Sequence, residues 1–445
     1  MIKYTLFALL LNLAIYSHAQ ENAIATLKFE EAEAAFNSGN YATALNKLDE
    51  VDKLAGIMSK SLYLRIVATD IIFDYYDVKS TTLLTLGKYV DSYLKTMEAE
   101  GLDDKYRAVY AISGRVNTAL QVKKWKESLE FINGEKAGKD KNFEEAIAWL
   151  KKGEAKGNLA AINYIGLVYQ SQQKYQEAFD HFNKAASAGY ATAMRNLAGY
   201  YLGGVKGVVA QNYDEAMKWY LKAAENGEAD AFDSIGMMYS FGQSVTKNEA
   251  EALKWYGRAV NKGQVSAMEN MGMLYHFVSE SFRDHTKAMF WYRMALERGS
   301  KQMENNVGSL YFEGKGVPQN YPEALNWFKK AAANGNIRSA NNIGDMYFNG
   351  HGSAKNYAEA LTWYKKAYES NESEQKQRAK ESLGKCYYEM AKEKYLKKDY
   401  TSALDDYKSA FSFGNRMARY SIAAMYRDGL GVAKDKKIAK EWENK

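Results

Sequence analysis

Residues 321–336 have the sequence YPEALNWFKKAAANGN, which is typical of one short amphipathic helix that ends near a glycine. Four of its residues share one face at helical spacing: Ala324, Trp327, Phe328 and Ala331. Closely similar stretches occur at three other places: 213–227, 248–263 and 357–367. Self-similarity of this kind predicts a fold built by repeating one supersecondary unit.

Five tryptophans give the length of the repeat. They lie 36 residues apart: Trp219, Trp255, Trp291, Trp327 and Trp363. The same register continues less regularly on both sides, and an alanine stands three residues before each marker position. Eight residues after the marker comes a glycine, or Asn371 in one unit. Since both residue types adopt the left-handed conformation just past a helix end, we predict that the helices end at these positions.

A second helix is predicted to precede each of these. Its marker is a small residue three positions before a tyrosine: Gly166, Ala198, Gly236, Gly272, Gly308, Gly344, Gly384 and Ala423. A glycine inside a helix costs about 1 kcal/mol relative to alanine, so its recurrence predicts close contact between helices. We expect that contact to be with the recurring alanine of the partner helix. Each unit is then a helical hairpin that buries its apolar face by stacking on its neighbours, which predicts an all-α solenoid.

These features carry a family resemblance. The small-x-x-Tyr helix, the A-L-x-W-[YF]-x-K-A helix and the turns GKGVPQN (314–320) and GLGVAKD (429–435) resemble Sel-1-like repeats of the secreted bacterial type. These repeats are relatives of the tetratricopeptide (TPR) repeat. The resemblance covers residues 143–445, about seven to eight repeats, and implies a right-handed α-solenoid of stacked antiparallel hairpins. Three places depart from the pattern: the turn of unit 264–299, the polar insert 372–379, and Asp406, which replaces an aromatic residue.

The first 19 residues predict a secretory signal peptide. Lys3 precedes an apolar run of about a dozen residues, and Ser17 and Ala19 offer the small residues of a cleavage site before Gln20. This run is too short to span a bilayer, and no lipidation cysteine follows it. We therefore expect a periplasmic or secreted chain with no membrane span after cleavage. An uncleaved anchor or a buried helix is the alternative.

Residues 20–133 are predicted to form an N-terminal TPR-like helical region. The stretch 28–51 is similar to a TPR hairpin with Gly39 and Asn40 at its turn. The polar stretch 133–142 is the candidate boundary to the repeat solenoid at 143–445. Alternatively, this stretch is an enlarged turn in one continuous solenoid.

The sequence offers no recognisable catalytic or metal site. It lacks H-E-x-x-H, G-x-S-x-G and G-x-x-x-x-G-K-[ST], and its S-x-x-K matches lack the companion motifs. His276 and His285 could approach each other across one hairpin, but without a third ligand we expect two partly exposed surface histidines. The net charge of +6 comes from interleaved lysine and glutamate, which is typical of a solvated surface and not of nucleic-acid binding. We expect no enzyme activity, cofactor or metal.

The candidate site is the groove that first helices line in TPR-type hairpins. Seven polar residues lie three positions before the small residue: Asn163, Arg195, Asp233, Glu269, Asn305, Asn341 and Glu381. Three more candidates follow it: Phe312, Asp345 and Phe348. We expect these side chains to face solvent and to bind an extended peptide or a helix. Simple solvated helix faces are the alternative.

A separate set of asparagines fits hydrogen bonds between helices better than recognition. They lie one residue further along the first helices: Asn196, Asn270, Asn306 and Asn342.

The predicted function is a non-catalytic protein–protein interaction scaffold or adaptor of the bacterial cell envelope. Its partner would be a protein or peptide of the envelope, held in the concave groove, with no nucleic acid involved. The alternative is an envelope enzyme or ligand-binding protein that acts on peptidoglycan or β-lactams, because the resemblance extends to secreted proteins linked to such ligands. The sequence favours the scaffold, since it offers no nucleophile with a neighbouring base.

Overall fold

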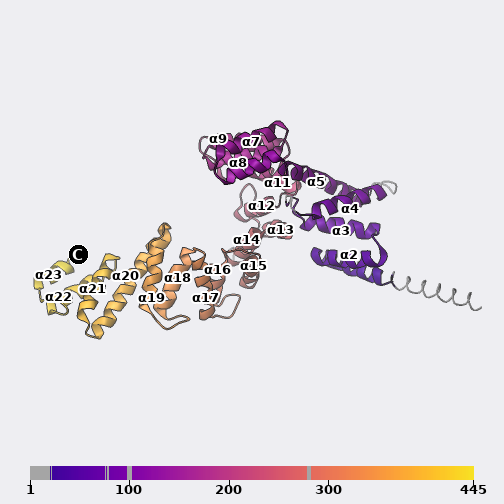
Figure 1. Cartoon of the computed structure of the whole chain (residues 1–445). Coiled ribbons are helices and arrows are strands. Elements are labelled where there is room, and N and C mark those ends of the chain that lie inside the picture. Colours follow the sequence, from indigo (N-terminus) through magenta and orange to yellow (C-terminus); the bar gives the residue numbers. More distant parts are fainter. Residues whose placement is uncertain (1–20, 22, 76, 78–79, 98–102, 278–281) are drawn as a thin grey trace, which may run out of the picture. The chain divides into compact units, whose positions relative to one another are not determined.

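The computed structural model describes residues 21, 23–75, 77, 80–97, 103–277 and 282–445. The predicted signal peptide therefore lies outside the described residues. Within them the regular secondary structure is helical, apart from one isolated β-bridge between Val205 and Val209. The chain divides into two compact units, Met1–Ala267 (unit 1) and Met268–Lys445 (unit 2), each a series of helices in chain order (Figure 1).

Unit 1 opens with a helical stretch at 23–37 and continues with four helices before the repeats. These are α2 (Tyr41–Ala55), α3 (Ser59–Ile72), α4 (Thr82–Met97) and α5 (Asp104–Lys126). Its repeat helices are α6 (Leu129–Lys139), α7 (Phe143–Ala155), α8 (Leu159–Ser171), α9 (Tyr175–Ser187), α10 (Ala191–Gly203), α11 (Tyr213–Glu225), α12 (Ala229–Phe241) and α13 (Glu249–Asn261).

Helix α14 (Val265–Phe277) crosses the limit between the units, and unit 2 continues the repeats. Its helices are α15 (His285–Glu297), α16 (Glu304–Glu313), α17 (Tyr321–Ala333), α18 (Ile337–Asn349), α19 (Tyr357–Tyr368), α20 (Ser373–Leu396), α21 (Tyr400–Ser412), α22 (Ala418–Asp428) and α23 (Lys436–Glu443). The helices follow one another as consecutive paired hairpins, such as α12 with α13 and α18 with α19, which confirms the predicted all-α solenoid.

The predicted helix ends are confirmed where glycine stands at the stop. Seven glycines have a positive φ there: Gly157, Gly189, Gly227, Gly263, Gly299, Gly335 and Gly414. The same expectation for Asn371 is wrong, because Asn371 has no positive φ. Helix α19 already ends at Tyr368, and the polar insert 372–379 opens the 24-residue helix α20.

The recurring glycine of five first helices contacts an aromatic ring of the partner helix. The expected contact with the recurring alanine is seen at Gly308, where a Cβ atom would lie 3.3 Å from the main-chain oxygen of Ala324. The five pairs are Gly166–Phe182, Gly236–Tyr256, Gly272–Tyr292, Gly308–Phe328 and Gly344–Tyr364. A Cβ atom at Gly236 would lie 2.6 Å from two carbons of the Tyr256 ring. The ring therefore fills the space that a side chain at the glycine would need.

The second glycine of the glycine-rich turns makes a contact between repeats. Gly316 and Gly352 both have a positive φ, and a Cβ atom on either would overlap the backbone at the start of the preceding second helix. That backbone belongs to His285 in the first case and to Tyr321 in the second. These turns need glycine both for their conformation and for this close approach.

The polar stretch 133–142 contains the end of α6 and the turn into α7, where Lys141 has a φ of 60°. It is thus part of a helical hairpin and not an enlarged turn. The division of the chain into an N-terminal region and a repeat solenoid at this point stays a prediction.

The stretch 28–51 forms the predicted helical hairpin, with Gly39 at a φ of 81° and Asn40 as the N-cap of α2, while its TPR-like character stays a prediction. Further along the chain, Asp406 stands at a position where the repeat pattern has an aromatic residue. It forms an ion pair with Lys394 at 2.6 Å.

The link between α3 and α4 packs on the repeat helices of unit 1. Tyr75 is 1% exposed, and its ring lies against the backbone of Gly227 in the turn between α11 and α12. Asp70 lies near the end of α3. Its carboxylate forms a bidentate ion pair with Arg115 at 2.9 Å and accepts a hydrogen bond from the hydroxyl of Tyr75 at 2.5 Å. The segment 70–75 and Arg115 of α5 thus meet at one carboxylate.

Lys262, at the end of α13, completes this contact, which we call the α3–α13 contact. Its ammonium donates to the main-chain oxygens of Asp70 and Phe73, the latter at 2.8 Å. A cation at the C-terminal end of a helix stabilises the unpaired carbonyls there. Burial lowers the pKa of Lys262 to about 8, while Asp70 acts in the opposite direction.

The two histidines of the hairpin α14–α15 lie together, as the sequence suggested, with ring centroids 5.3 Å apart. His276 is buried, however, so the expectation of a partly exposed side chain is wrong for this residue. Its Nδ1 lies 3.1 Å from the hydroxyl of Tyr292. Burial, followed by the neighbouring His285, lowers the pKa of His276 to about 4.

The glycine–ring contact can be tested within the hairpin α12–α13. Gly236→Ala should lower the free energy of unfolding by about 1–3 kcal/mol, because its Cβ atom would overlap Tyr256. Gly257→Ala, in the partner helix, has open space around the new atom and should stabilise by about 0.5–1 kcal/mol. Urea unfolding of both variants checks this. Equal effects would contradict the assignment.

The α3–α13 contact predicts the effect of Lys262→Met. Loss of the ammonium leaves two buried carbonyl groups without their donor, which should cost about 1–3 kcal/mol. Amide hydrogen exchange should become faster in α3. The exposed Lys254→Met is the matched control and should change stability by less than about 0.5 kcal/mol. Unchanged exchange in α3 for Lys262→Met would refute the contact.

The buried His276 predicts that acid destabilises unit 2. Since its folded pKa is about 4 and an unfolded histidine titrates near 6.5, only the unfolded state gains the proton as the pH falls between these values. The free energy of unfolding should have its full value above pH about 6.5 and fall by about 1–3 kcal/mol towards pH 4. Urea unfolding at several pH values across this range checks this dependence. His276→Gln should remove most of this pH dependence, and an unchanged slope would disprove the explanation.

Candidate functional site

Several predicted groove residues are buried between repeats and do not face solvent as expected. Asn163, Asn305 and Asn341 are 4%, 5% and 0% exposed. Asn341 donates from Nδ2 to the main-chain oxygen of Gln375 at 3.0 Å and to its Oε1 at 3.1 Å. The expectation fails because the next first helix covers this face, so these amides hold the repeats together.

The separate asparagine set does form hydrogen bonds between helices, as predicted, at two of its positions. Asn196 of α10 donates to Asn163 of α8 at 2.9 Å, and Asn342 of α18 donates to Asn305 of α16 at 3.2 Å. Ser339 of α18 also donates to Asn305, at 2.8 Å. Successive first helices are therefore joined side by side by an amide ladder.

The charged members of the predicted set have different surroundings. Arg195 forms ion pairs with the buried Glu228 at 3.2 Å and with Asp230 at 3.6 Å. Burial raises the pKa of Glu228, although Arg195 opposes this effect. Asp233 is 8% exposed.

The other two predicted carboxylates make local contacts in unit 2. Glu269 accepts a hydrogen bond from Ser300 of the following turn. Glu381 is exposed and accepts one from Gln377 on its own helix, at 2.9 Å.

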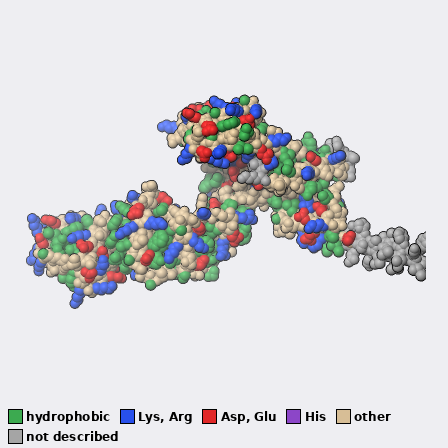
Figure 2. Space-filling model, in the orientation of Figure 1, with side chains coloured by type: hydrophobic (Ala, Val, Ile, Leu, Met, Phe, Trp, Pro, Cys, Tyr) green, Lys and Arg blue, Asp and Glu red, His purple; other side chains and the backbone are tan. Residues whose placement is uncertain are grey.

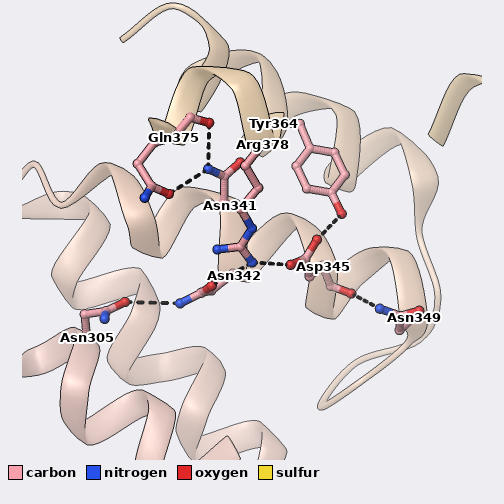
Figure 3. Close-up of polar contacts among 8 residues, drawn as sticks. All are labelled: Asn305, Asn341, Asn342, Asp345, Asn349, Tyr364, Gln375 and Arg378. Carbon is pink, nitrogen blue, oxygen red and sulfur yellow. Dashed lines mark hydrogen bonds and ion pairs between the residues drawn. The ribbon is translucent and has the colours of Figure 1, made fainter. Parts of the chain in front are cut away.

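In unit 2 the first helices α18 and α20 carry a polar cluster, drawn in Figure 3. Arg378 of α20 bonds the carboxylate of Asp345 at 2.5 Å and Oδ1 of Asn342 at 3.1 Å. Tyr364, from the second helix α19, donates to the same carboxylate at 2.6 Å. Burial and this carboxylate raise the pKa of Tyr364. Three residues of the cluster were predicted as site residues from the sequence: Asn305, Asn341 and Asp345.

A small cavity of about 200 Å³ lies beside this cluster. Its lining residues are Ser309, Phe312, Glu313, Phe328, Asn342, Asp345 and Arg378. Two predicted site residues, Phe312 and Asp345, are thus brought together. Phe348 is not part of this lining and packs on Tyr357, with ring centroids 5.3 Å apart.

Unit 1 holds a larger cavity of about 520 Å³, which we call the unit 1 cavity. Its lining comes mainly from the first helices α8, α10 and α12: Gln170, Tyr175, Arg195, Asn196, Gly199, Tyr200, Val205, Tyr220, Asp230, Asp233, Ser234 and Ser266. The predicted residues Arg195 and Asp233 meet here. The cavity combines carboxylates, amides and hydroxyls with three tyrosine rings.

Most of the lining residues of both cavities were not predicted from the sequence. The position directly after the small residue lines a cavity in three units. Asp345 was predicted there, and Gly199 and Ser309 share its register and could have been found from it. Arg378 lies in the insert and has no register position. Tyr220 occupies a position that the pattern assigns to the core, and it is buried as well as lining the cavity.

Across the described ranges, no group of three or more His, Cys, Asp or Glu side chains is arranged to hold a metal ion. No described helix has both the length and the apolar character that crossing a membrane requires. Basic and acidic side chains are interspersed with apolar ones on the visible face of each unit (Figure 2).

Solved structures similar to the chain include two with Sel1-type repeats. A protective antigen of uropathogenic Escherichia coli that displays an SLR fold is 24% identical, with a TM-score of 0.42 over 67% of this chain and 78% of that chain. A Sel1 repeat protein from Oxalobacter formigenes is also 24% identical, with a TM-score of 0.40 over 64% of this chain and 95% of that chain. None of the curated proteins matches the chain significantly.

The Sel1 repeat family profile matches eight segments of the chain. They are residues 130–158, 153–190, 191–228, 234–264, 265–300, 302–336, 337–372 and 416–442. Sel1 repeat proteins are generally non-catalytic protein-interaction scaffolds. Because these segments together span more than half of the sequence, the chain belongs to the Sel1 repeat family.

Proposed function

We propose that this protein is a non-catalytic scaffold of the bacterial cell envelope that binds a partner protein or peptide on its first helices. The observation that carries this proposal is the unit 1 cavity. It lies on three consecutive first helices and is lined by polar and aromatic side chains. Such a surface suits the side chains of an extended peptide, which needs polar partners along its backbone and pockets for its side chains.

Some polar residues join the repeats and others are exposed at the cavity, and this difference supports the proposal. The amide ladder uses Asn163 and Asn196 to join α8 and α10, so these groups are already engaged in the free protein. Gln170 and Tyr175, in contrast, are exposed at the cavity. A rigid ladder beneath exposed side chains holds them in place before a partner arrives, which reduces the entropy lost on binding.

The envelope location rests on the sequence of the first 19 residues. A basic residue, an apolar run and small residues before Gln20 are typical of an export signal. We therefore propose that the partner belongs to the envelope.

A photo-cross-linking experiment tests the proposal. A photoreactive amino acid at Gln170, on the cavity wall, should form a covalent adduct with a partner protein in intact bacteria. The same group at Lys254, exposed on the second helix α13, is the matched control and should form no such adduct. Mass spectrometry of the envelope fraction identifies the adduct and the N-terminus of the chain.

The adduct should depend on the cavity wall, so Tyr175→Ala should reduce its yield at Gln170 several-fold. Adducts in equal yield at both positions, or at neither, would reject the scaffold. An adduct found only with cytoplasmic proteins, on a chain that still begins at Met1, would reject the envelope location.

A further inference from the structure

The unit 1 cavity carries more negative than positive charge. Among its lining residues Arg195 is the single cation and forms an ion pair with Asp230 at 3.6 Å, while a second carboxylate, Asp233, lines the same cavity. The same guanidinium also neutralises Glu228, which is buried behind it. The two lining carboxylates thus outnumber the one lining cation, which is also paired with Glu228, and an additional cation would be attracted to this site.

A buried hydroxyl on the cavity wall is a second indication of a ligand site. Tyr200 lines the cavity and is 7% exposed, yet its hydroxyl oxygen has no hydrogen-bond partner among the described residues. Burial raises the pKa of Tyr200 to about 12, so the hydroxyl stays neutral. Since buried polar groups are nearly always hydrogen-bonded, this one is available to a ligand.

The remaining wall suits the apolar part of a long cationic side chain. Three tyrosines line the cavity, and Tyr175 is 41% exposed. Aromatic ring faces attract cations, and the methylene stem of arginine packs well along them. The side-chain oxygens of Gln170 and Ser234 add acceptors around the same space. A guanidinium carries five N–H donors and matches such a set of acceptors better than a compact ammonium does.

We propose that the unit 1 cavity binds an arginine side chain in an extended segment of the partner protein. This inference rests on the proposed function and adds the chemistry by which the partner is recognised. The guanidinium lies against Asp230 and Asp233, its stem packs on the tyrosine rings, and the hydroxyl of Tyr200 gains a hydrogen-bond partner.

Two synthetic peptides test this with the full chain. The first is a heptapeptide, Gly-Ser-Gly-Arg-Gly-Ser-Gly, carrying a neutral fluorophore, and the second replaces its arginine with citrulline, which has the same shape without the charge. Fluorescence anisotropy should give at least tenfold tighter binding of the arginine peptide. Equal affinity for the two peptides would overturn the proposal.

Matched charge variants locate the site. Asp230→Asn with Asp233→Asn should weaken binding of the arginine peptide at least tenfold and leave the citrulline peptide unaffected. Asp180→Asn with Glu251→Gln removes the same charge from second helices of unit 1 and should change the affinity less than twofold. Equal weakening in both double variants would mean non-specific charge attraction and would also overturn the proposal.

Tyr200→Phe provides a test that does not depend on the folding of the charge variants. It removes a hydroxyl without a partner, so the melting temperature should stay equal or rise, while the arginine peptide should bind several-fold more weakly. Unchanged binding would contradict the assigned contact.

The two proposals can fail separately. An adduct at Gln170 together with equal affinity for both peptides would reject only the arginine site. Arginine-specific binding without any adduct would reject only the scaffold.

Discussion

The absence of a Cβ atom at the middle of five first helices is the constraint on which their hairpins depend. It lets an aromatic ring of the second helix lie directly on the backbone of the first, as Tyr256 does on Gly236. The same principle operates between repeats, where Gly316 meets the backbone of His285. Interiors this tightly packed tolerate little change in volume, so each hairpin and each stacking step has one favoured geometry.

Once the stacking is set, the polar residues of the first helices have two roles. Some join neighbouring first helices through the amide ladder, such as Asn342 with Asn305. Others line the cavities, such as Asp230 in unit 1 and Asp345 in unit 2, and Asn342 does both. The proposed recognition surface is therefore a consequence of how the repeats pack, because the ladder determines the spacing of the side chains that remain available.

Much of the fold could be predicted from the sequence, because the glycine, alanine and aromatic markers recur at one period and each has a local cause. The site was harder to predict. A register position gives the face of a helix, but not whether the neighbouring repeat covers that face, and so Asn341 was expected in solvent although it is fully buried. Arg378 lies in an insert that the period does not describe. Asn371 shows a further limit, because a residue that tolerates the left-handed conformation does not have to adopt it.

The α3–α13 contact has a consequence for the order in which unit 1 is completed. Stacked hairpins contact their neighbours in sequence, whereas Lys262 and Asp70 are separated by 192 residues. At a synthesis rate of about 5–20 residues per second, the segment between them takes roughly 10–40 s to appear. Until then, the carbonyl groups at the end of α3 lack their cation and Tyr75 lacks the turn that covers it. The helices synthesised earliest, such as α3, are thus among the last to reach their final packing. They depend on repeats that the ribosome has not yet produced.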